Sequence, residues 1–324
     1  MGTDKILFIG GSMNQTTMMH QIAQHLMDEY DCYFTTYYSD GFLGLLAKAR
    51  LLEFTVMGEK RARQSREYFE AHHLKTDYGG TAGDYDLVVS SSDLVIQRNI
   101  ADKKIVLVQE GMTDPEKWTY HLVKTLKLPR YLAGTSTTGL SDAYEKFCVA
   151  SEGYRDLFIR KGVKPEKIVV TGIPNFDNVK RFLDNDFPHK HYVLVATSDA
   201  RETLKIHNRK KFIQYALDIA GDRQVIFKLH PNEKKERAVR EIKALAPHAL
   251  IYTEGNTDEM IANCDVLITQ YSTVNYVGLA LGKEVHSYDL DVAELRKLTP
   301  WQNGGKSSEY IAEVCRNVIK GTST

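Results

Sequence analysis

Residues 223–289 alternate between short apolar runs and segments with a helical pattern. The apolar runs cover 225–229, 249–252 and 266–269. Strands that alternate with helices form parallel sheets, and such sheets bind ligands beyond the carboxyl ends of their strands. Two of the runs end in polar turns, Leu-His-Pro-Asn at 229–232 and Gln-Tyr-Ser-Thr at 270–273. An imidazole, hydroxyls and helix starts at one sheet edge are suited to binding a pyrophosphate.

The same alternation runs through the whole chain and predicts an α/β fold with two Rossmann-like, doubly wound domains. The chain opens with a strand at 5–9, and the first βαβ unit ends near residue 37. A charged, proline-bearing segment at 181–190 interrupts the pattern, so we expect domains at 1–185 and 186–324. A final amphipathic helix is expected at about 307–320 and is a candidate to cross back to the first domain.

Composition and charge narrow the class of protein. The chain has 42 basic and 42 acidic residues, so no nucleic-acid partner is expected. Its four cysteines lie far apart without a CxxC spacing, which predicts neither a zinc site nor a redox pair. The amino terminus lacks a signal-peptide pattern, and no apolar run approaches the ~20 residues of a membrane-spanning helix. We therefore expect a cytoplasmic protein.

Two segments of the first half carry candidate site residues. Gly10, Gly11 and Ser12 follow the first strand and would allow a ligand to approach the backbone closely. The spacing matches neither a dinucleotide fingerprint nor a P-loop, and a Gly-Gly turn in this place is more often only a tight turn. Glu110 follows another apolar run and precedes Gly111. A carboxylate there is well placed as a general base, or equally as a helix-capping acid.

The motifs of the second half resemble those of a known superfamily. Lys228-Leu229-His230-Pro231 looks like the His-Pro motif of transferases that use cytidine-nucleotide donors. The Ile-Thr-Gln-Tyr-Ser-Thr run at 268–273, with Leu-Gly-Lys at 281–283 and Tyr-Asp-Leu-Asp at 288–291, resembles the CDP-glycerol glycerophosphotransferase family. Segments 150–152 and 171–177 are similar to that family and to nucleotide-sugar 2-epimerases. The resemblance implies the GT-B glycosyltransferase fold, in which two domains face a cleft.

The resemblance also implies roles for individual residues of the second half. His230 would contact the donor phosphates and stabilise the leaving group, together with the hydroxyls of Ser272 and Thr273. The matching motifs add further donor-binding candidates: Ser198, Arg201, Lys228, Pro231 and Tyr271. The glycine loop Gly10, Gly11 and Ser12 completes the predicted donor site. Glu110 would remove the proton of the acceptor hydroxyl. No metal and no cofactor are expected, because the matched family works without a metal.

Departures from the family patterns affect the choice of donor. Val277 stands five residues before Gly282, where many sugar-nucleotide enzymes of this fold have a ribose-binding Glu, and this favours a cytidine donor over UDP-sugars. Gln270 replaces the Asp of the glycerophosphotransferases, and their amino-terminal base histidine has no match. The run Val-Gln-Glu-Gly-Met around Glu110 instead resembles His-Val-Glu-Ala-Gly of the 2-epimerases.

The sequence thus predicts a transferase that moves a glycosyl or glycerophosphate group from a CMP or CDP donor. The acceptor would be a sugar or polyol hydroxyl, lipid-linked or soluble, in bacterial surface polysaccharide or teichoic-acid-like synthesis. That role leaves peripheral association with the inner face of a membrane open, and the oligomeric state is not predicted. Two alternatives remain, a UDP-sugar enzyme of the 2-epimerase or GT-B type and a non-catalytic nucleotide-sugar-binding module.

Overall fold

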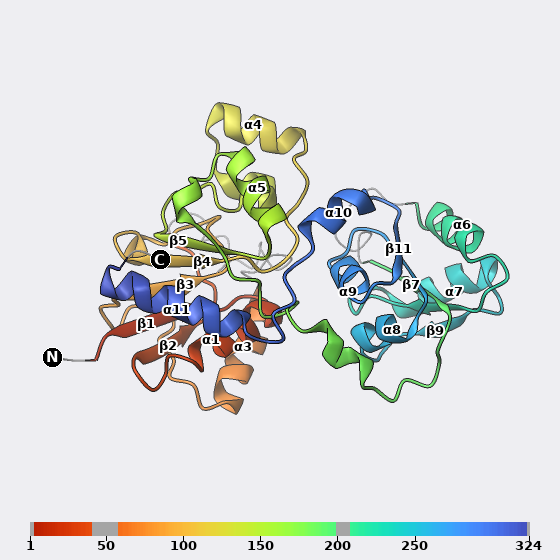
Figure 1. The fold of residues 1–324 in the computed structure, drawn as a ribbon, viewed down its shortest axis with the longest axis horizontal. Helices are drawn as coiled ribbons and strands as arrows, with labels where there is room; N and C mark the ends of the chain where they lie inside the picture. The colour runs from red at the N-terminus through yellow and green to blue at the C-terminus, as the bar shows by residue number, and fades with distance from the viewer. Residues whose placement is uncertain (1–2, 41–57, 199–207, 323–324) are drawn as a thin grey trace. The chain divides into compact units, whose positions relative to one another are not determined.

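The computed structural model describes residues 3–40, 58–198 and 208–322. The chain forms two compact α/β units, each built on a parallel sheet (Figure 1). Unit 1 contains Met1–Asp177 and Gly305–Thr324, and unit 2 contains Asn178–Gly304. The predicted architecture of two parallel-sheet α/β domains is confirmed. The chain passes into unit 2 at Asn178, whereas the sequence suggested residue 186, and the last residues belong to unit 1.

The sheet of unit 1 has the strand order β2-β1-β3-β4-β5-β6, with every neighbouring pair parallel. Its strands are β1 (Lys5–Ile9), β2 (Asp31–Thr35), β3 (Leu87–Ser90), β4 (Ile105–Val108), β5 (Lys146–Val149) and β6 (Ile168–Val170). Successive side chains of a strand point to opposite faces, and both faces are covered here. Ile6 and Phe8 enter one core while Leu7 is buried on the other face, so continuous apolar runs form these strands.

The helices of unit 1 pack around this sheet. They are α1 (Met13–Ala23), α3 (Glu59–Ala71), α4 (Trp118–Leu126) and α5 (Glu152–Lys161), with 3₁₀ turns η1 (Arg98–Ile100), η2 (Arg130–Thr137) and η3 (Pro165–Lys167). The charged, partly amphipathic residues 41–77 predict helical structure, which corresponds in part to α3; residues 41–57 lie outside the described residues. Pro115 also predicts a helix start, but α4 begins only at Trp118.

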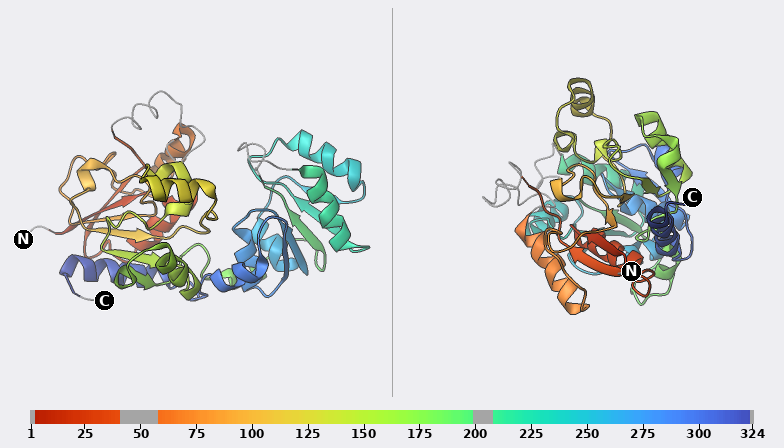
Figure 2. Two further views of the ribbon diagram at one scale, coloured as in Figure 1. Left: turned by 90° about the horizontal axis from the view of Figure 1, so that it is seen from above. Right: turned by 90° about the vertical axis from the view of Figure 1, so that its left-hand side faces the viewer.

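The carboxyl-terminal helix α11 (Ser307–Lys320) belongs to unit 1, as the sequence suggested. It lies beside α1 on one face of the first sheet (Figures 1 and 2). Its buried face, which includes Ile311, Cys315 and Val318, shares a core with the strands of that sheet. The Asp177 carboxylate accepts the Ser307 backbone N–H at 2.7 Å. One acid at the end of the first segment thus caps the start of the returning helix.

The sheet of unit 2 has the order β11-β10-β7-β8-β9, again parallel throughout. The strands are β7 (Val193–Ala196), β8 (Val225–Lys228), β9 (Leu250–Tyr252), β10 (Val266–Thr269) and β11 (Glu284–Ser287). The helices are α6 (Arg209–Ala220), α7 (Lys235–Leu245), α8 (Thr257–Asn263), α9 (Val274–Ala280) and α10 (Val292–Leu298), preceded by η4 (Val179–Leu183). Apart from α10 and η4, all of these elements were expected from the sequence. Gly278 of α9 is needed because a Cβ there would lie 2.7 Å from the Leu267 side chain.

Candidate functional site

The carboxyl edge of the second sheet collects the polar turns predicted from the sequence. Strand β7 lies between β10 and β8, so Ser198 follows the central strand and His230 and Gln270 follow its two neighbours. Because all three strands run parallel, these turns meet at one edge of the sheet. The topology therefore brings Ser198, His230 and the 270–273 turn together.

The turn that carries His230 is fixed by a buried carboxylate. Glu233 accepts the His230 backbone N–H at 2.8 Å and is hydrogen-bonded by the Thr197 hydroxyl. The His230 N–H also lies 3.2 Å from the Thr197 oxygen. The Asn232 backbone N–H donates to His230 Nδ1 at 3.2 Å. A neutral imidazole that accepts at Nδ1 carries its proton on Nε2, so Nε2 is the nitrogen equipped to donate to a phosphate oxygen.

Glu233 also pairs with Arg209, the first residue of α6. Arg209 Nη1 lies 2.6 Å from Glu233 Oε1, and the two side chains are only 7% and 4% exposed. Within the described part of the chain, Arg209 Nε and Nη2 are buried without a hydrogen-bond partner. Buried polar atoms are nearly always paired, and guanidinium nitrogens are donors suited to an anion. Neither Arg209 nor Glu233 was predicted as a site residue from the sequence.

Lys228 adds a second buried cation at the same edge. It is the last residue of β8, and its Nζ donates to the Leu229 carbonyl at 2.9 Å. Burial lowers the pKa of Lys228 from its ordinary value, and nearby Lys235 lowers it further while Glu233 opposes the shift. The buried ionisable groups Lys228, Arg209 and Glu233 together carry an excess of positive charge when Lys228 is protonated. Such a site favours an anionic ligand.

The turn after β10 is organised by Gln270, which is buried. Its side-chain oxygen accepts the Ser198 hydroxyl at 3.0 Å, and its backbone carbonyl accepts the Ser287 hydroxyl at 2.7 Å. The bond between Gln270 and Ser198 joins the ends of β10 and β7. Tyr271, Ser272 and Thr273 follow half-buried, and α9 begins at Val274.

The predicted donor-binding residues of the second half therefore have a common location. Ser198, Lys228 and His230 lie at one edge of the sheet, with exposed Pro231 after His230 and the 271–273 turn beside them. Arg201 lies outside the described residues. Donor binding by these side chains remains a prediction.

In unit 1, the glycine loop lies next to Glu110. The Ser12 hydroxyl donates to Glu110 Oε1 at 2.8 Å, and Gln15 Nε2 donates to Glu110 Oε2 at 2.6 Å. Ser12 and Gln15 also form a capping box at the start of α1. Gly11 is needed there, because a Cβ would lie 1.9 Å from the Gln15 side-chain oxygen. Ser12 and Gln15 thus hold the Glu110 carboxylate in place, and donor binding by Gly10, Gly11 and Ser12 stays a prediction.

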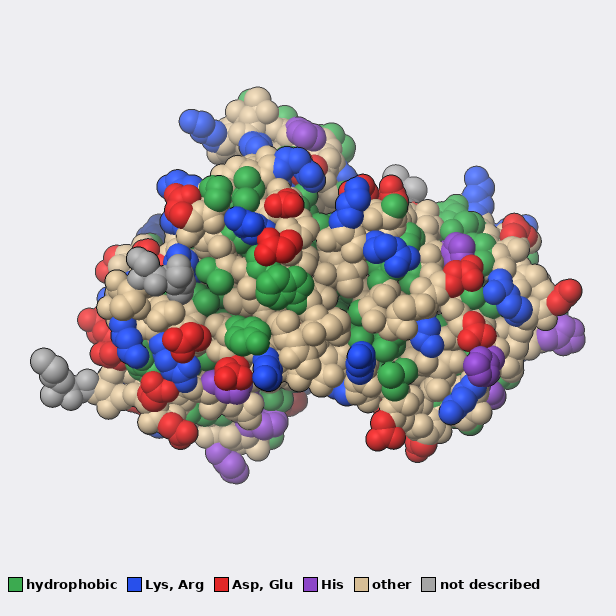
Figure 3. Space-filling view, viewed as in Figure 1, with side chains coloured by type: hydrophobic (Ala, Val, Ile, Leu, Met, Phe, Trp, Pro, Cys, Tyr) green, Lys and Arg blue, Asp and Glu red, His purple; other side chains and the backbone are tan. Residues whose placement is uncertain are grey.

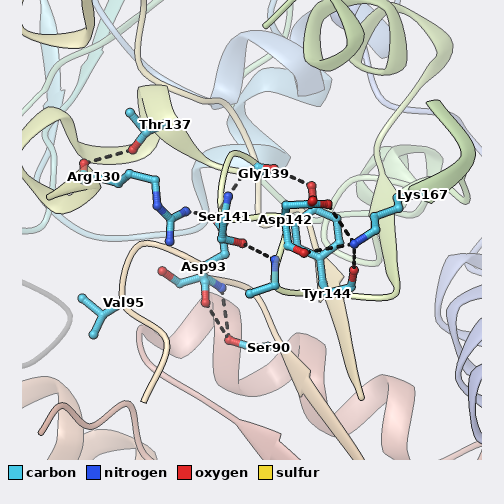
Figure 4. A network of polar contacts seen from close by, with 12 residues as sticks. Ser90, Asp93, Val95, Arg130, Thr137, Gly139, Ser141, Asp142, Tyr144 and Lys167 are labelled. Atoms are coloured by element: carbon cyan, nitrogen blue, oxygen red, sulfur yellow. Dashed lines mark hydrogen bonds and ion pairs between the residues drawn. The ribbon is translucent and has the colours of Figure 1, made fainter. Parts of the chain in front are cut away.

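The small-residue loop at 131–140 is anchored by Asp93 (Figure 4). This carboxylate is 1% exposed and accepts the backbone N–H groups of Gly139 and Ser141, each at 3.0 Å. Arg130 Nη1 donates to it at 2.9 Å. The loop is therefore held in place by a buried acid that uses both oxygens.

A cavity of about 560 Å³ lies between α6 and α7 rather than at the predicted turns. It is lined by Asn208, Arg209, Lys210, Ile213, Glu241, Ala244 and Leu245. Only Arg209 of this lining also belongs to the His230 network, so we place the candidate site by its polar groups and not by the cavity.

Residues 3–40, 58–198 and 208–322 lack both a metal-binding cluster and a membrane-spanning helix. Among them, no three His, Cys, Asp or Glu side chains converge so as to hold a metal ion. No helix of those segments has the length and apolar character needed to cross a membrane.

Comparisons with known proteins bear on the fold. No protein-family model matches the sequence, and no curated protein matches it. Among solved structures, the S. aureus MnaA–UDP complex gives a TM-score of 0.58 at 12% identity, covering 98% of this chain and 97% of that one. The Neisseria meningitidis UDP-GlcNAc 2-epimerase bound to UDP-GlcNAc gives 0.56 at 12% identity, covering 97% and 100%.

Another neighbour is a polymerase. The wall teichoic acid polymerase TagF, in a structure soaked with CDPG, gives a TM-score of 0.50 at 14% identity, covering 98% of this chain and 90% of that one. At such identities the likeness concerns the fold alone. The chain has the two-domain, GT-B-like α/β fold of these neighbours.

Proposed function

We propose that this protein is an enzyme that transfers a group from a nucleotide-activated donor to a hydroxyl acceptor. The observation that carries the proposal is the buried network around His230. Glu233 fixes the backbone of the turn, and Arg209 keeps two guanidinium nitrogens without a partner in the described chain. Fixed donors of this kind stabilise the charge that develops on a leaving phosphate, because they need no rearrangement during the reaction.

We propose a cytidine nucleotide as the donor, CMP- or CDP-linked. The His-Pro motif at 230–231, the Tyr-Ser-Thr turn at 271–273 and Val277 in place of a ribose-binding Glu support this choice. The fold likeness to a teichoic acid polymerase that was soaked with CDPG is compatible with it. His230 would donate from Nε2 to the pyrophosphate, with Ser272 and Thr273 beside it and Lys228 adding charge. The reaction is proposed to proceed without a metal.

Glu110 is the proposed general base for the acceptor hydroxyl. Ser12 and Gln15 each donate to one of its oxygens, which fixes the orientation of the carboxylate. Each oxygen keeps a second lone pair that is able to accept the acceptor's proton. The acceptor would be a sugar or polyol, in surface polysaccharide or teichoic-acid-like synthesis.

A UDP-sugar 2-epimerase is the second candidate. The Gln-Glu-Gly run at 109–111 that places Glu110 just beyond β4 favours it, because this run resembles the epimerase motif. Product analysis with a UDP-sugar alone separates the two functions, since an epimerase changes its substrate without an acceptor.

The first experiment is a thermal-shift screen with CMP, CDP, UMP and UDP, with and without magnesium. A nucleotide at about 100 times its dissociation constant should stabilise the fold by about 2.7 kcal/mol. Stabilisation by CMP or CDP without magnesium, lost in His230→Ala and retained in the exposed control His248→Ala, is the expected result. A preference for UDP would move the proposal to the epimerase, and no shift with any nucleotide would refute both.

The proposed base is tested separately by turnover. Glu110→Gln should abolish transfer while nucleotide affinity stays close to that of the unmodified chain. The exposed Glu116→Gln serves as the matched control and should keep full activity. Equal loss of binding and turnover in Glu110→Gln would contradict the assignment. Tight nucleotide binding without turnover on any acceptor would instead indicate a non-catalytic binding module.

A further inference from the structure

Helix α4 leaves a row of large apolar side chains uncovered. Trp118, Leu122 and Leu126 are 74%, 42% and 59% exposed, and their spacing of four residues puts them on one helix face. Tyr131 and Leu132, just after the helix, are exposed as well. These five make up five of the twelve exposed large hydrophobic side chains in the described part of the chain. We call these five residues the α4 patch.

The opposite face of α4 holds the helix firmly on unit 1. Tyr120 and Val123 are buried, and Lys124 Nζ donates to the Lys161 carbonyl at 2.9 Å. Beyond the helix, Arg130 is tied to the buried Asp93. The patch is therefore presented by an anchored element. Figure 1 and the right-hand view of Figure 2 show α4 projecting away from the first sheet.

The charged residues within segment 117–141 are all basic. Residues 117–141 contain no Asp or Glu, while Lys117, Lys124, Lys127 and Arg130 lie within this segment. Lys117 and His121 follow one another at helical spacing beside the apolar row, and both are exposed. The nearest acid in sequence is Glu116, directly before Lys117. Green, blue and purple side chains gather on this projection in Figure 3.

We propose that the α4 patch docks on an anionic membrane surface. An interfacial helix combines Trp and Leu on its apolar face with Lys or Arg beside them, and α4 with its following turn has this arrangement. Trp118 and the leucines enter the boundary between headgroups and acyl chains, and the exposed Lys117 and Lys127 contact anionic headgroups. The inference does not depend on the proposed transferase activity.

The test uses the full chain and large unilamellar vesicles, either phosphatidylcholine alone or mixed with phosphatidylglycerol. The triple variant Trp118→Ser, Leu122→Ser, Leu126→Ser should bind the anionic vesicles at least about tenfold more weakly. Lys117→Gln should weaken binding about fivefold on anionic vesicles and leave phosphatidylcholine binding unchanged. A matched control, Leu183→Ser with Tyr310→Ser, removes exposed apolar side chains elsewhere and should bind normally.

Fluorescence gives a direct readout, because Trp118 and Trp301 are the only tryptophans in the chain. In a Trp301→Phe variant the emission should shift to the blue on mixing with anionic vesicles, as Trp118 leaves water. The proposal would be overturned if the protein neither sedimented together with anionic vesicles nor showed the blue shift. Unchanged vesicle binding by the triple variant would overturn it as well. If the chain instead self-associates in size-exclusion chromatography and the triple variant abolishes this, the patch binds a second copy and the proposal is wrong.

Discussion

Glu233→Gln probes the network on which the proposed donor site depends. The Glu233 carboxylate accepts from Arg209, from the Thr197 hydroxyl and from the His230 backbone N–H. Glutamine is neutral and turns one of the two acceptor atoms into a donor, so its amide faces a donor in either orientation. Removing one partner of a buried ion pair costs about 3–5 kcal/mol. We expect Glu233→Gln to lower the free energy of unfolding of unit 2 by about 3 kcal/mol, the lower end of this range, because the remaining oxygen still accepts hydrogen bonds.

Urea unfolding measures this loss if the signal comes from unit 2. A Trp118→Phe background leaves Trp301, which belongs to that unit, as the single fluorophore. Glu254→Gln is the control, because it removes a carboxylate that pairs with Lys235 at an exposed position. The unfolding midpoint of this control should not change. The double variant with Arg209→Met removes both buried charges and should recover about 2 kcal/mol relative to the sum of the single losses.

Two outcomes would refute this reasoning. A loss below about 1 kcal/mol for Glu233→Gln would mean that the carboxylate contributes no more than an ordinary neutral hydrogen bond. Strict additivity of Glu233→Gln and Arg209→Met would mean that the two side chains are not coupled.

Three further predictions concern other buried groups. Asp93→Asn should destabilise unit 1 by about 2 kcal/mol and speed amide hydrogen exchange at Gly139 and Ser141. The exposed control Asp102→Asn should have neither effect, and unchanged exchange in Asp93→Asn would contradict the anchoring role. Burial raises the pKa of Cys32, Cys148 and Cys264 to about 12 and that of Cys315 well above its ordinary value, so a thiol reagent at pH 8 should label all four only after denaturation. The lowered pKa of Lys228 means that the unfolded chain binds more protons between the folded pKa and 10.5, so stability rises with pH across that window. Lys228→Met should therefore increase stability at neutral pH, flatten that slope and weaken nucleotide binding, with exposed Lys210→Met as the control; a loss of stability would contradict the assignment.

The strands and most helices of unit 2 were predictable because each buried strand appears in the sequence as a short apolar run. Val-Leu-Val-Ala in β7, Val-Ile-Phe-Lys in β8 and Val-Leu-Ile-Thr in β10 are buried at every position, as central strands of a parallel sheet require. The amphipathic pattern of Ile311, Cys315 and Val318 likewise predicted α11. The helix packs on the core of unit 1. The amphipathic pattern predicts which face of the helix is buried, but it does not identify the surface that covers this face.

The pair Arg209 and Glu233 could not be predicted in the same way. Arg209 lies in the run His-Asn-Arg-Lys-Lys and Glu233 in Pro-Asn-Glu-Lys-Lys, which both look like solvated helix starts. The two residues meet because β7 and β8 are neighbours and both βα turns lie at the carboxyl edge. The pairing of Arg209 with Glu233 is predictable only when the strand order is known, because opposite charges then lie in adjacent βα turns. A single sequence does not supply that order.

The hydrogen bonds of Glu233 and Asn232 to His230 give the His-Pro motif a fixed geometry. Sequence reasoning treated His230 as a phosphate ligand, but its backbone N–H and Nδ1 are already engaged by Glu233 and Asn232. The imidazole is thus preset, and Glu233 is a positioning residue that acts through it. Glu233→Gln should therefore weaken CMP, CDP, UMP and UDP binding by a similar factor, because the phosphates are common to all four and the base is not. A changed cytidine-to-uridine preference in titrations of this variant would place Glu233 at the base instead, and would show that the His230 turn is not the phosphate-binding element.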